Sequence, residues 1–398
     1  MGFYSIAPYF ACMAILMALA ATPAFVLADT PPSEKSRRVH SVDGLRGYLA
    51  LGVFFSHATI YHDFLQTRTW GNGPSHFYND LGPLAVLMFF MITGYLFWSK
   101  LIRDGGKPNW LSLFVGRIFR IGPLYLTAVL SMLAVVFVVT GFRLNVPLGH
   151  LVRQVGEWLT LGFIEGPDVN GYANTSVLLA RVTWSIRWEW MFYLSLPILA
   201  IASRGKRHLP FVASAFAVCI AICAWRAEQG RPHLVLISAF LAGMLSASLQ
   251  THPKAIKIRD TLASILVLLM LTATFFFQNP YSAGPVLLLG SVFYAITSGC
   301  TVFGLLVSRP AIRLGDVSYG IYLLQGLVLA AVFRSSFVRG VTSSPVLNWS
   351  LTLIAGILLI AVATAGHVIV ERPGIALGKY VSSTIQARHK ERMVAVKG

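Results

Sequence analysis

Long apolar runs recur along almost the whole of this chain, and they constrain its fold more strongly than any other feature. Each run reaches about 20 residues, which as an α-helix spans about 30 Å, the thickness of the hydrocarbon part of a bilayer. The sequence therefore predicts an all-α, polytopic membrane helix bundle with ten core transmembrane helices. We place these helices near 42–62, 82–101, 121–140, 186–203, 209–226, 233–250, 260–278, 284–307, 317–336 and 347–370.

The composition agrees with a chain whose solvent is lipid. Of its 398 residues, 56% are hydrophobic and only 12% are charged, whereas soluble domains carry about 25% charged residues. The mean hydropathy of +0.68 is also too high for one ordinary soluble core. We therefore expect membrane lipids to surround the helices.

A further apolar run at the N-terminus, about 4–28, has two interpretations. It ends in Val26-Leu27-Ala28 before Asp29, which is similar to the cleavage site of a signal peptide. However, the first ten residues contain no Lys or Arg, and a signal peptide needs a positive start. This favours an additional, retained transmembrane helix whose N-terminus lies outside, and the signal-like alternative stays open.

The basic residues indicate the topology. When residues 29–46 are placed in the cytoplasm and the sides alternate, 23 of the 32 Lys and Arg fall on the inner side, including every lysine. The positive-inside rule then puts both ends of the core in the cytoplasm and makes 141–183 the longest outer loop. We expect the protein to lie in the inner (plasma) membrane of the cell. The formal charge of +17 reflects this topology, and we expect no nucleic-acid partner because the basic clusters are short and separated by apolar runs.

The chain divides into three parts on these grounds. Residues 1–40 form the N-terminal hydrophobic helix and a basic linker, 41–373 form the membrane domain, and 374–398 form a basic cytoplasmic tail. The cysteines lie in apolar segments without zinc-like spacing, so no metal site is predicted. They are Cys12, Cys219, Cys223 and Cys300.

Ionisable residues in the first core helix indicate a functional site, because such groups are costly inside a membrane. Arg46 lies at the inner end, and His57 follows eleven residues later, about 16 Å deeper and close to three whole turns away. Asp43 falls near the same face. An imidazole can accept a proton near neutral pH. The alternative is a histidine that simply bonds a neighbouring helix.

Two more sets of polar residues share helix faces. Arg117 and Arg120 are spaced i, i+3 at an inner helix start, where they can bind phosphate or only anchor the helix. Ser185, Glu189 and Tyr193 are spaced i, i+4, i+8, and Glu189 can orient a substrate hydroxyl or form a structural ion pair.

A late segment, Gly315 to Gln325, places polar side chains on one face of another helix. Ser318, Tyr322 and Gln325 share that face. Hydrogen bonds between helices are the favoured role for them.

Six segments, in this order, resemble the motifs of the membrane acyltransferase family often called acyltransferase 3. The resemblance covers about 41–373. One motif alone would be weak, whereas six in order are specific. The segments are Asp43-Gly44-Leu45-Arg46-Gly47 with His57, Phe89-Phe90-Met91-Ile92-Thr93-Gly94-Tyr95-Leu96, Arg117-x-x-Arg120 with Pro123 and Tyr125, Trp184-Ser185 with Glu189 and Phe192-Tyr193, Ser318-Tyr319-Gly320-Ile321-Tyr322-Leu323, and Glu371-Arg372-Pro373.

Two positions depart from the family pattern. Trp190 stands where the family has a second glutamate, and Gln325 stands where a late histidine often follows. Glutamine cannot exchange a proton. His57 and Glu189 are therefore the remaining candidates for proton transfer.

The resemblance implies an acyl-CoA-dependent O-acyltransferase that uses acyl-CoA, with acetyl-CoA expected, as a substrate and needs no permanently bound cofactor. The acceptor is expected to be a hydroxyl of a carbohydrate, such as a cell-surface polysaccharide or a glycolipid. His57 is the expected general base, with Glu189 and Arg46 as further catalytic candidates. Arg117, Arg120 and Arg46 are expected to bind the donor. Supporting roles fall to Asp43, Ser185, Tyr193 and Tyr322.

A transporter or flippase of a glycolipid or an acyl group is the competing class, because multi-helix proteins with buried charges often move substrates. No repeated half-chain favours it. A structural scaffold explains the helices but not the pairs Arg46/His57 and Arg117/Arg120. Direct transfer and a covalent relay through a side chain both remain open.

Overall fold

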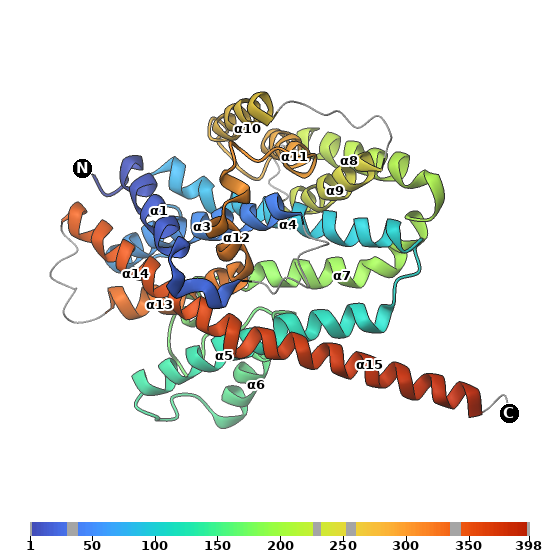
Figure 1. Cartoon of the computed structure of the whole chain (residues 1–398). Coiled ribbons are helices and arrows are strands. Elements are labelled where there is room, and N and C mark those ends of the chain that lie inside the picture. The colour runs from blue at the N-terminus through green and yellow to red at the C-terminus, as the bar shows by residue number, and fades with distance from the viewer. Residues whose placement is uncertain (1, 30–38, 226–231, 252–259, 335–343, 396–398) are drawn as a thin grey trace.

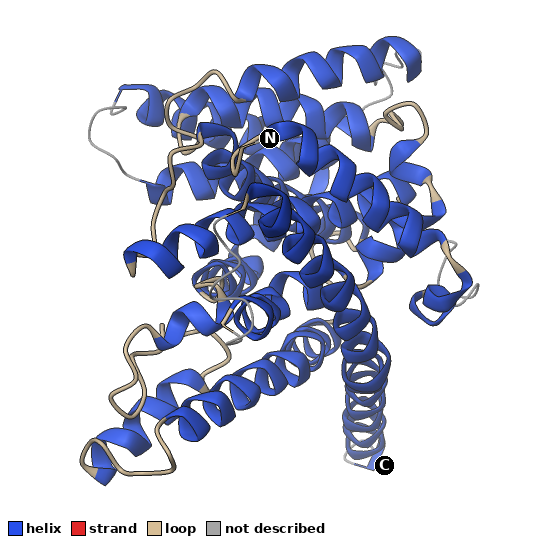
Figure 2. Cartoon of the chain, turned by 90° about the vertical axis from the view of Figure 1, so that its left-hand side faces the viewer, coloured by secondary structure: helices blue, strands red, loops and turns tan. Residues whose placement is uncertain are grey.

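The computed structural model describes residues 2–29, 39–225, 232–251, 260–334 and 344–395, and within these ranges it contains fourteen α-helices and no strand. Figure 2 shows helices and connecting loops, and no strand, in the described part of the chain. The predicted all-α fold class is confirmed.

Each of the ten predicted core segments contains an α-helix. The core helices are α3 (His40–Thr67), α4 (His76–Arg103), α5 (Trp110–Val139), α7 (Trp184–Ala202), α8 (His208–Trp225), α9 (Pro232–Gln250), α10 (Asp260–Thr274), α11 (Ala283–Thr297), α13 (Ser318–Phe333) and α14 (Pro345–Gly366). The N-terminal apolar run forms α1 (Ile6–Ala21) and a 3₁₀-helix, η1 (Pro23–Ala28).

Fewer than the predicted ten helices are long and apolar enough to span a membrane. Among the described residues, five helices qualify: α4, α5, α8, α9 and the stretch Pro345–Arg388. A sixth span results if α12 (Arg309–Asp316) and α13, bent by 70° at their junction, count together. α1, α10 and α11 are apolar but shorter than about 20 residues. A count of ten core spans is therefore not confirmed.

The prediction of one helix over 284–307 is wrong in its second half. α11 ends at Thr297, and the chain then turns through Gly299, whose φ of +114° suits glycine. A short 3₁₀-helix, η5 (Leu305–Val307), and α12 follow. Apolar composition alone does not reveal this turn, because the segment is as hydrophobic as the helix before it.

The last helix also extends further than predicted. After α14 the helix continues through a π-helical turn, η6 (His367–Glu371), into α15 (Arg372–Ala395). Pro373 lies just after this π-helical turn and does not end the helix. Figure 1 shows α15 passing α5 and extending beyond the bundle towards the C-terminus.

Two close helix crossings fix the core. On α4, a Cβ at Gly94 would collide with the carbonyl oxygen of Phe240 on α9, and a Cβ at Gly243 on α9 would collide with Met91. Gly44 and Gly47 of α3 approach the backbones of η5 and α12 just as closely. Small residues let membrane helices pack backbone against backbone.

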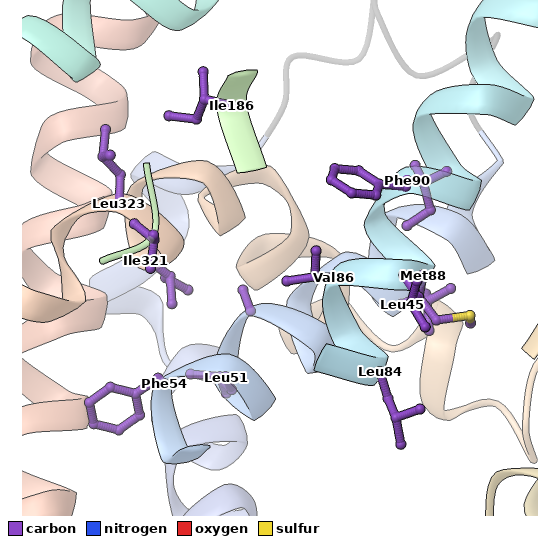
Figure 3. Packing of buried hydrophobic residues seen from close by; sticks show 14 of the residues in the cluster. Leu45, Leu51, Phe54, Leu84, Val86, Met88, Phe90, Ile186, Ile321 and Leu323 are labelled. Atoms are coloured by element: carbon purple, nitrogen blue, oxygen red, sulfur yellow. The ribbon is translucent and has the colours of Figure 1, made fainter. Parts of the chain in front are cut away.

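Buried apolar side chains from α3, α4, α7 and α13 fill the space between these crossings (Figure 3). Two unpredicted helices, α12 and α6 (Leu148–Trp158), complete the fold. α6 lies in the predicted outer loop.

Candidate active site

A cavity of about 720 Å³ opens among α3, α4, α5, α7, α13 and the α14–α15 helix. Eight of the nine predicted site residues line it: Asp43, Arg46, Arg117, Arg120, Ser185, Glu189, Tyr193 and Tyr322. The fold thus brings together residues that are up to 279 positions apart (from 43 to 322) in the sequence. The ninth, His57, is not among the lining residues.

The first motif divides its residues between packing and the cavity. Gly44 and Gly47 contact η5 and α12 closely, while Asp43 and Arg46, three residues apart, line the cavity. Arg46 lies within electrostatic reach of Asp43, Asp316 and Glu371, and also of Arg120. The acidic neighbours balance a cation that would otherwise be costly in the membrane.

The two arginines of the R-x-x-R segment have different surroundings. Arg120 Nη2 lies 3.1 Å from Glu371 Oε1, and the Glu371 side chain has no exposed surface. The Arg117 guanidinium carbon lies 5.1 Å from the ring centre of Phe97, a cation–π contact. Arg120 therefore holds two helices together as well as lining the cavity.

Glu189 faces the cavity from α7. The hydroxyl of Tyr193 donates to its Oε2 at 2.7 Å, and Arg117, Arg46 and Arg120 all interact with it electrostatically. Arg187, two residues away, is exposed and points elsewhere, as the helical spacing predicts.

Trp190, at the position where the family has a second glutamate, is a packing residue. Its Nε1 donates to the carbonyl oxygen of Leu161 at 2.8 Å, and its ring stacks on Phe163 at 4.9 Å. The indole therefore ties α7 to the outer loop instead of supplying a second carboxylate.

A hydrogen bond between two helices lies in the wall of the cavity. Ser185 Oγ and the Tyr322 hydroxyl lie 2.8 Å apart and join α7 to α13. Of the three polar residues predicted on the α13 face, Tyr322 bonds between helices as expected. Ser318 instead bonds the carbonyl of Gly315, and Gln325 bonds the carbonyl of Tyr322.

His57 lies deeper along α3, apart from the lining residues. Its ring centre is 5.8 Å from that of Trp70, and Gln325 lies beside it. Neither His57 Nδ1 nor Gln325 Oε1 has a hydrogen-bond partner within the described structure. The position that departs from the family pattern is therefore next to the predicted base.

The α14–α15 helix contributes residues that had no predicted role. His367 Nδ1 lies 2.9 Å from Glu371 Oε2, and Arg372 Nε donates to His367 Nε2 at 3.1 Å. His367, Arg372 and Lys379 all line the cavity. The i, i+4 spacing of His367 and Glu371 was a usable signal, but the π-helical turn that orients them was not visible in the sequence.

Comparison with known proteins identifies a family. The family model described as "Acyltransferase domain" matches residues 39–368. No solved structure matches the chain.

Two groups of relatives show different extents of similarity. "Putative O-acetyltransferase" proteins of Staphylococcus aureus, in strains COL and MSSA476, are each 28% identical over 178 residues, which cover 42% of this chain. The match spans only about a quarter (26%) of the length of those curated relatives. "Putative membrane-bound transacylase BcsY" of Komagataeibacter xylinus is 26% identical over 364 residues, covering 86% of this chain and 84% of its own.

Proposed function

Because this chain belongs to the acyltransferase family whose model matches residues 39–368, we propose that it transfers an acyl group, acetyl in the first instance, from acyl-CoA to a carbohydrate hydroxyl. The acceptor class is a cell-surface polysaccharide or a glycolipid. The protein is a membrane acyltransferase, and its donor, its acceptor and the orientation of its termini are part of this proposal.

The cationic lining of the cavity is the observation that carries the proposal. Five basic side chains, from α3, α5 and α15, meet there: Arg46, Arg117, Arg120, Arg372 and Lys379. Coenzyme A has a head with several phosphates, which guanidinium groups bind through paired, charge-assisted hydrogen bonds. A narrow thioester arm follows that head.

Apolar and hydroxyl side chains line much of the remainder of the cavity, together with the carboxylates of Asp43, Glu189 and Asp316. Phe89, Ile92 and Leu96 come from α4, and Ser185 and Tyr322 are the hydrogen-bonded pair that joins α7 to α13. We assign the apolar part to the pantetheine arm. We assign stabilisation of the oxyanion to the Tyr322 hydroxyl, which turns away from the carbonyl oxygen of Val182, its acceptor at 3.3 Å in the structure.

His57 acts as the general base in this mechanism. It removes the proton from the acceptor hydroxyl, whose oxygen attacks the thioester carbonyl carbon. The carbon–sulfur bond then breaks, and the CoA thiolate leaves and takes up a proton. Among the described residues, Nδ1 of His57 has no hydrogen-bond partner, and Gln325 is the polar side chain beside the ring. His57 lies beside Gln325, which is one helical turn past Tyr322 along α13, so the acyl end extends beyond Tyr322 to react.

The acceptor approaches from the side opposite to the donor head. His57 is seventeen residues from the start of α3, about 26 Å along the helix. Trp70, which contacts it, follows the C-terminal end of the same helix. With the start of α3 in the cytoplasm of the inner membrane, as the basic residues indicate, His57 lies towards the outer side.

Incubation of the purified protein with [¹⁴C]acetyl-CoA tests the proposal. Label that moves to an added glycan, or hydrolysis of the thioester, supports the enzyme. Binding of CoA without either reaction, together with movement of a labelled glycolipid across vesicle membranes, would instead support the flippase. Mass spectrometry of surface glycans from cells with and without the gene then identifies the acceptor.

A further inference from the structure

An unbroken series of polar contacts leads from the cavity to the N-terminal segment, which lies before the family match. Arg120 pairs with Glu371 at 3.1 Å, and Glu371 bonds His367 at 2.9 Å. His367 in turn accepts a hydrogen bond from Arg372 Nε at 3.1 Å. The other nitrogens of Arg372 donate to the backbone carbonyls of Leu27, Ala28 and Asp29 at 2.7, 3.0 and 2.7 Å.

The hydrogen-bond donors in this series determine which ring nitrogen of His367 carries the proton. An arginine Nε can only donate, so His367 Nε2 must be the acceptor. The ring proton is therefore on Nδ1, where it is donated to Glu371 Oε2. Glu371 Oε2 then accepts from His367, and Glu371 Oε1 forms the ion pair with Arg120.

The far end of the series is anchored as firmly as the cavity end. The Asp29 carboxylate accepts from Arg313 Nε at 2.5 Å and from Arg309 Nη2 at 2.9 Å. Arg313, with a side chain only 2% exposed, also donates to the carbonyls of Ala20 and Thr22, both at 2.8 Å. Both ends of η1 are therefore held against α12.

We propose that the N-terminal segment 23–29 is a positioning element for the donor site. It holds Arg372, and through His367 and Glu371 it sets the place of the Arg120 guanidinium in the cavity. This inference rests on the proposed binding of acyl-CoA. The segment must stay attached to the bundle for the contacts to exist, which gives the N-terminal apolar run a role in donor binding.

Asp29→Ala is the first test, because Asp29 anchors the segment and does not line the cavity. We expect the dissociation constant for coenzyme A, measured by titration calorimetry in nanodiscs, to rise about tenfold. The KM for acetyl-CoA rises with it, whereas kcat changes less than about threefold, because the reacting groups are untouched. Asp29→Asn keeps an oxygen acceptor and retains most of the affinity.

Tyr4→Phe is the matched control at the other end of the N-terminal apolar run, before α1. It removes a hydroxyl that donates to Asp63 of α3. We expect unchanged affinity for coenzyme A. An equal loss in both variants would mean that the segment acts by general stability, and this would overturn the proposal.

A double-mutant cycle shows whether Asp29 acts through Arg120. In an Arg120→Lys background, Asp29→Ala should change the dissociation constant less than about twofold, because the group it positions has gone. Additive effects would overturn the proposal.

A separate measurement tests the series of contacts independently of whether the protein binds acyl-CoA. Nitrogen-15 spectra of histidine-labelled protein, assigned with His367→Gln, should show neutral His367 with its proton on Nδ1, and a mixture of tautomers in Asp29→Ala. A charged or Nε2-protonated ring in the wild type overturns the series of contacts. Failure of the wild type to bind coenzyme A, with the expected tautomer present, refutes only the proposed function.

Discussion

Arg117 and Arg120 show how neighbouring residues of one motif take different tasks. Both lie on one face of α5 and both line the cavity. Arg120 is paired with the fully buried Glu371, whereas Arg117 rests on the Phe97 ring and interacts with Glu189. Their spacing is identical to that of a phosphate-binding pair, but their surroundings predict different effects of substitution.

Replacing each arginine should separate these effects. Arg117→Ala should raise the KM for acetyl-CoA about tenfold or more with little change in thermal stability, because it removes a charge-assisted contact to phosphate. Arg120→Ala should also lower stability, by up to about 3–5 kcal/mol, because it leaves the buried Glu371 without its ion-pair partner. Steady-state kinetics and thermal unfolding in detergent provide the comparison. Equal melting temperatures for the two variants would contradict it.

His57 gives the sharpest test at the level of one residue. His57→Ala should reduce transfer by about 10²–10⁴-fold, the usual contribution of a general base, while the protein remains inserted and folded. His62→Gln is the control on the same helix, since His62 stacks on Phe3 away from the cavity. Turnover by His57→Ala at the wild-type rate would exclude the assignment.

Helix elements in this protein are organised by close crossings between backbones. α4 and α9 meet at Gly94 and Gly243, and α3 meets η5 and α12 at Gly44 and Gly47. These crossings hold α3 and α4 in the positions from which Arg46 and Thr93 line the cavity. Glycines in the two motifs thus serve the site indirectly, through the distance between helices.

Gly94→Val should therefore destabilise the bundle by at least about 1–3 kcal/mol, the usual cost of overpacking, since the added atoms meet the Phe240 backbone. Gly116→Ala on α5 is the matched control, because a Cβ there meets no atom within 4 Å. It should be neutral or slightly stabilising. Unfolding followed by the reactivity of the buried cysteines with a thiol dye distinguishes the two.

The anchor at Asp29 predicts a pH dependence for the N-terminal segment. Hydrogen bonding from Arg313, followed by that from Arg309, lowers the pKa of Asp29 below its usual value of about 3.9. A lowered folded pKa stabilises the protein above the unfolded pKa, and this contribution is lost as the pH falls through the folded value. Protease digestion of the segment should therefore increase only below about pH 4. A similar increase in Asp29→Asn would contradict this, because that side chain does not titrate.

At the scale of the whole molecule, residues 3–29 contact the rest of the bundle at both of their ends. Near its start, Phe3 stacks on His62, and the carbonyl of Ser5 accepts from Tyr78 at 2.9 Å. At its other end Asp29 bonds Arg313. Figure 1 shows α1 lying beside α3 and α14 in agreement with the contact between Leu16 and Gly356.

Labelling of single cysteines tests the orientation of this assembly. In a chain without native cysteines, Gly149→Cys in α6 should react with a membrane-impermeant maleimide in intact cells, because α6 lies in the predicted outer loop. Lys107→Cys, between α4 and α5, should react only after the membrane is opened. The reverse pattern would invert the proposed topology and the side from which the donor enters.

The sequence by itself determined the helical class, the position of most core helices to within a few residues, and eight of the residues that line the cavity. Hydrophobic length and helical periodicity are local properties, so they can be read from the chain. The family resemblance came from local motifs for the same reason.

Only the tertiary structure decided the turn after Thr297, the continuous α14–α15 helix, the partner of Arg120 and the separation of His57 from the cavity. Each of these depends on contacts between segments far apart in the sequence. The connection from Asp29 to Arg120 is the clearest case. It passes through Arg372, His367 and Glu371 near the C-terminal end of the chain, and neither residue spacing nor a motif indicates it.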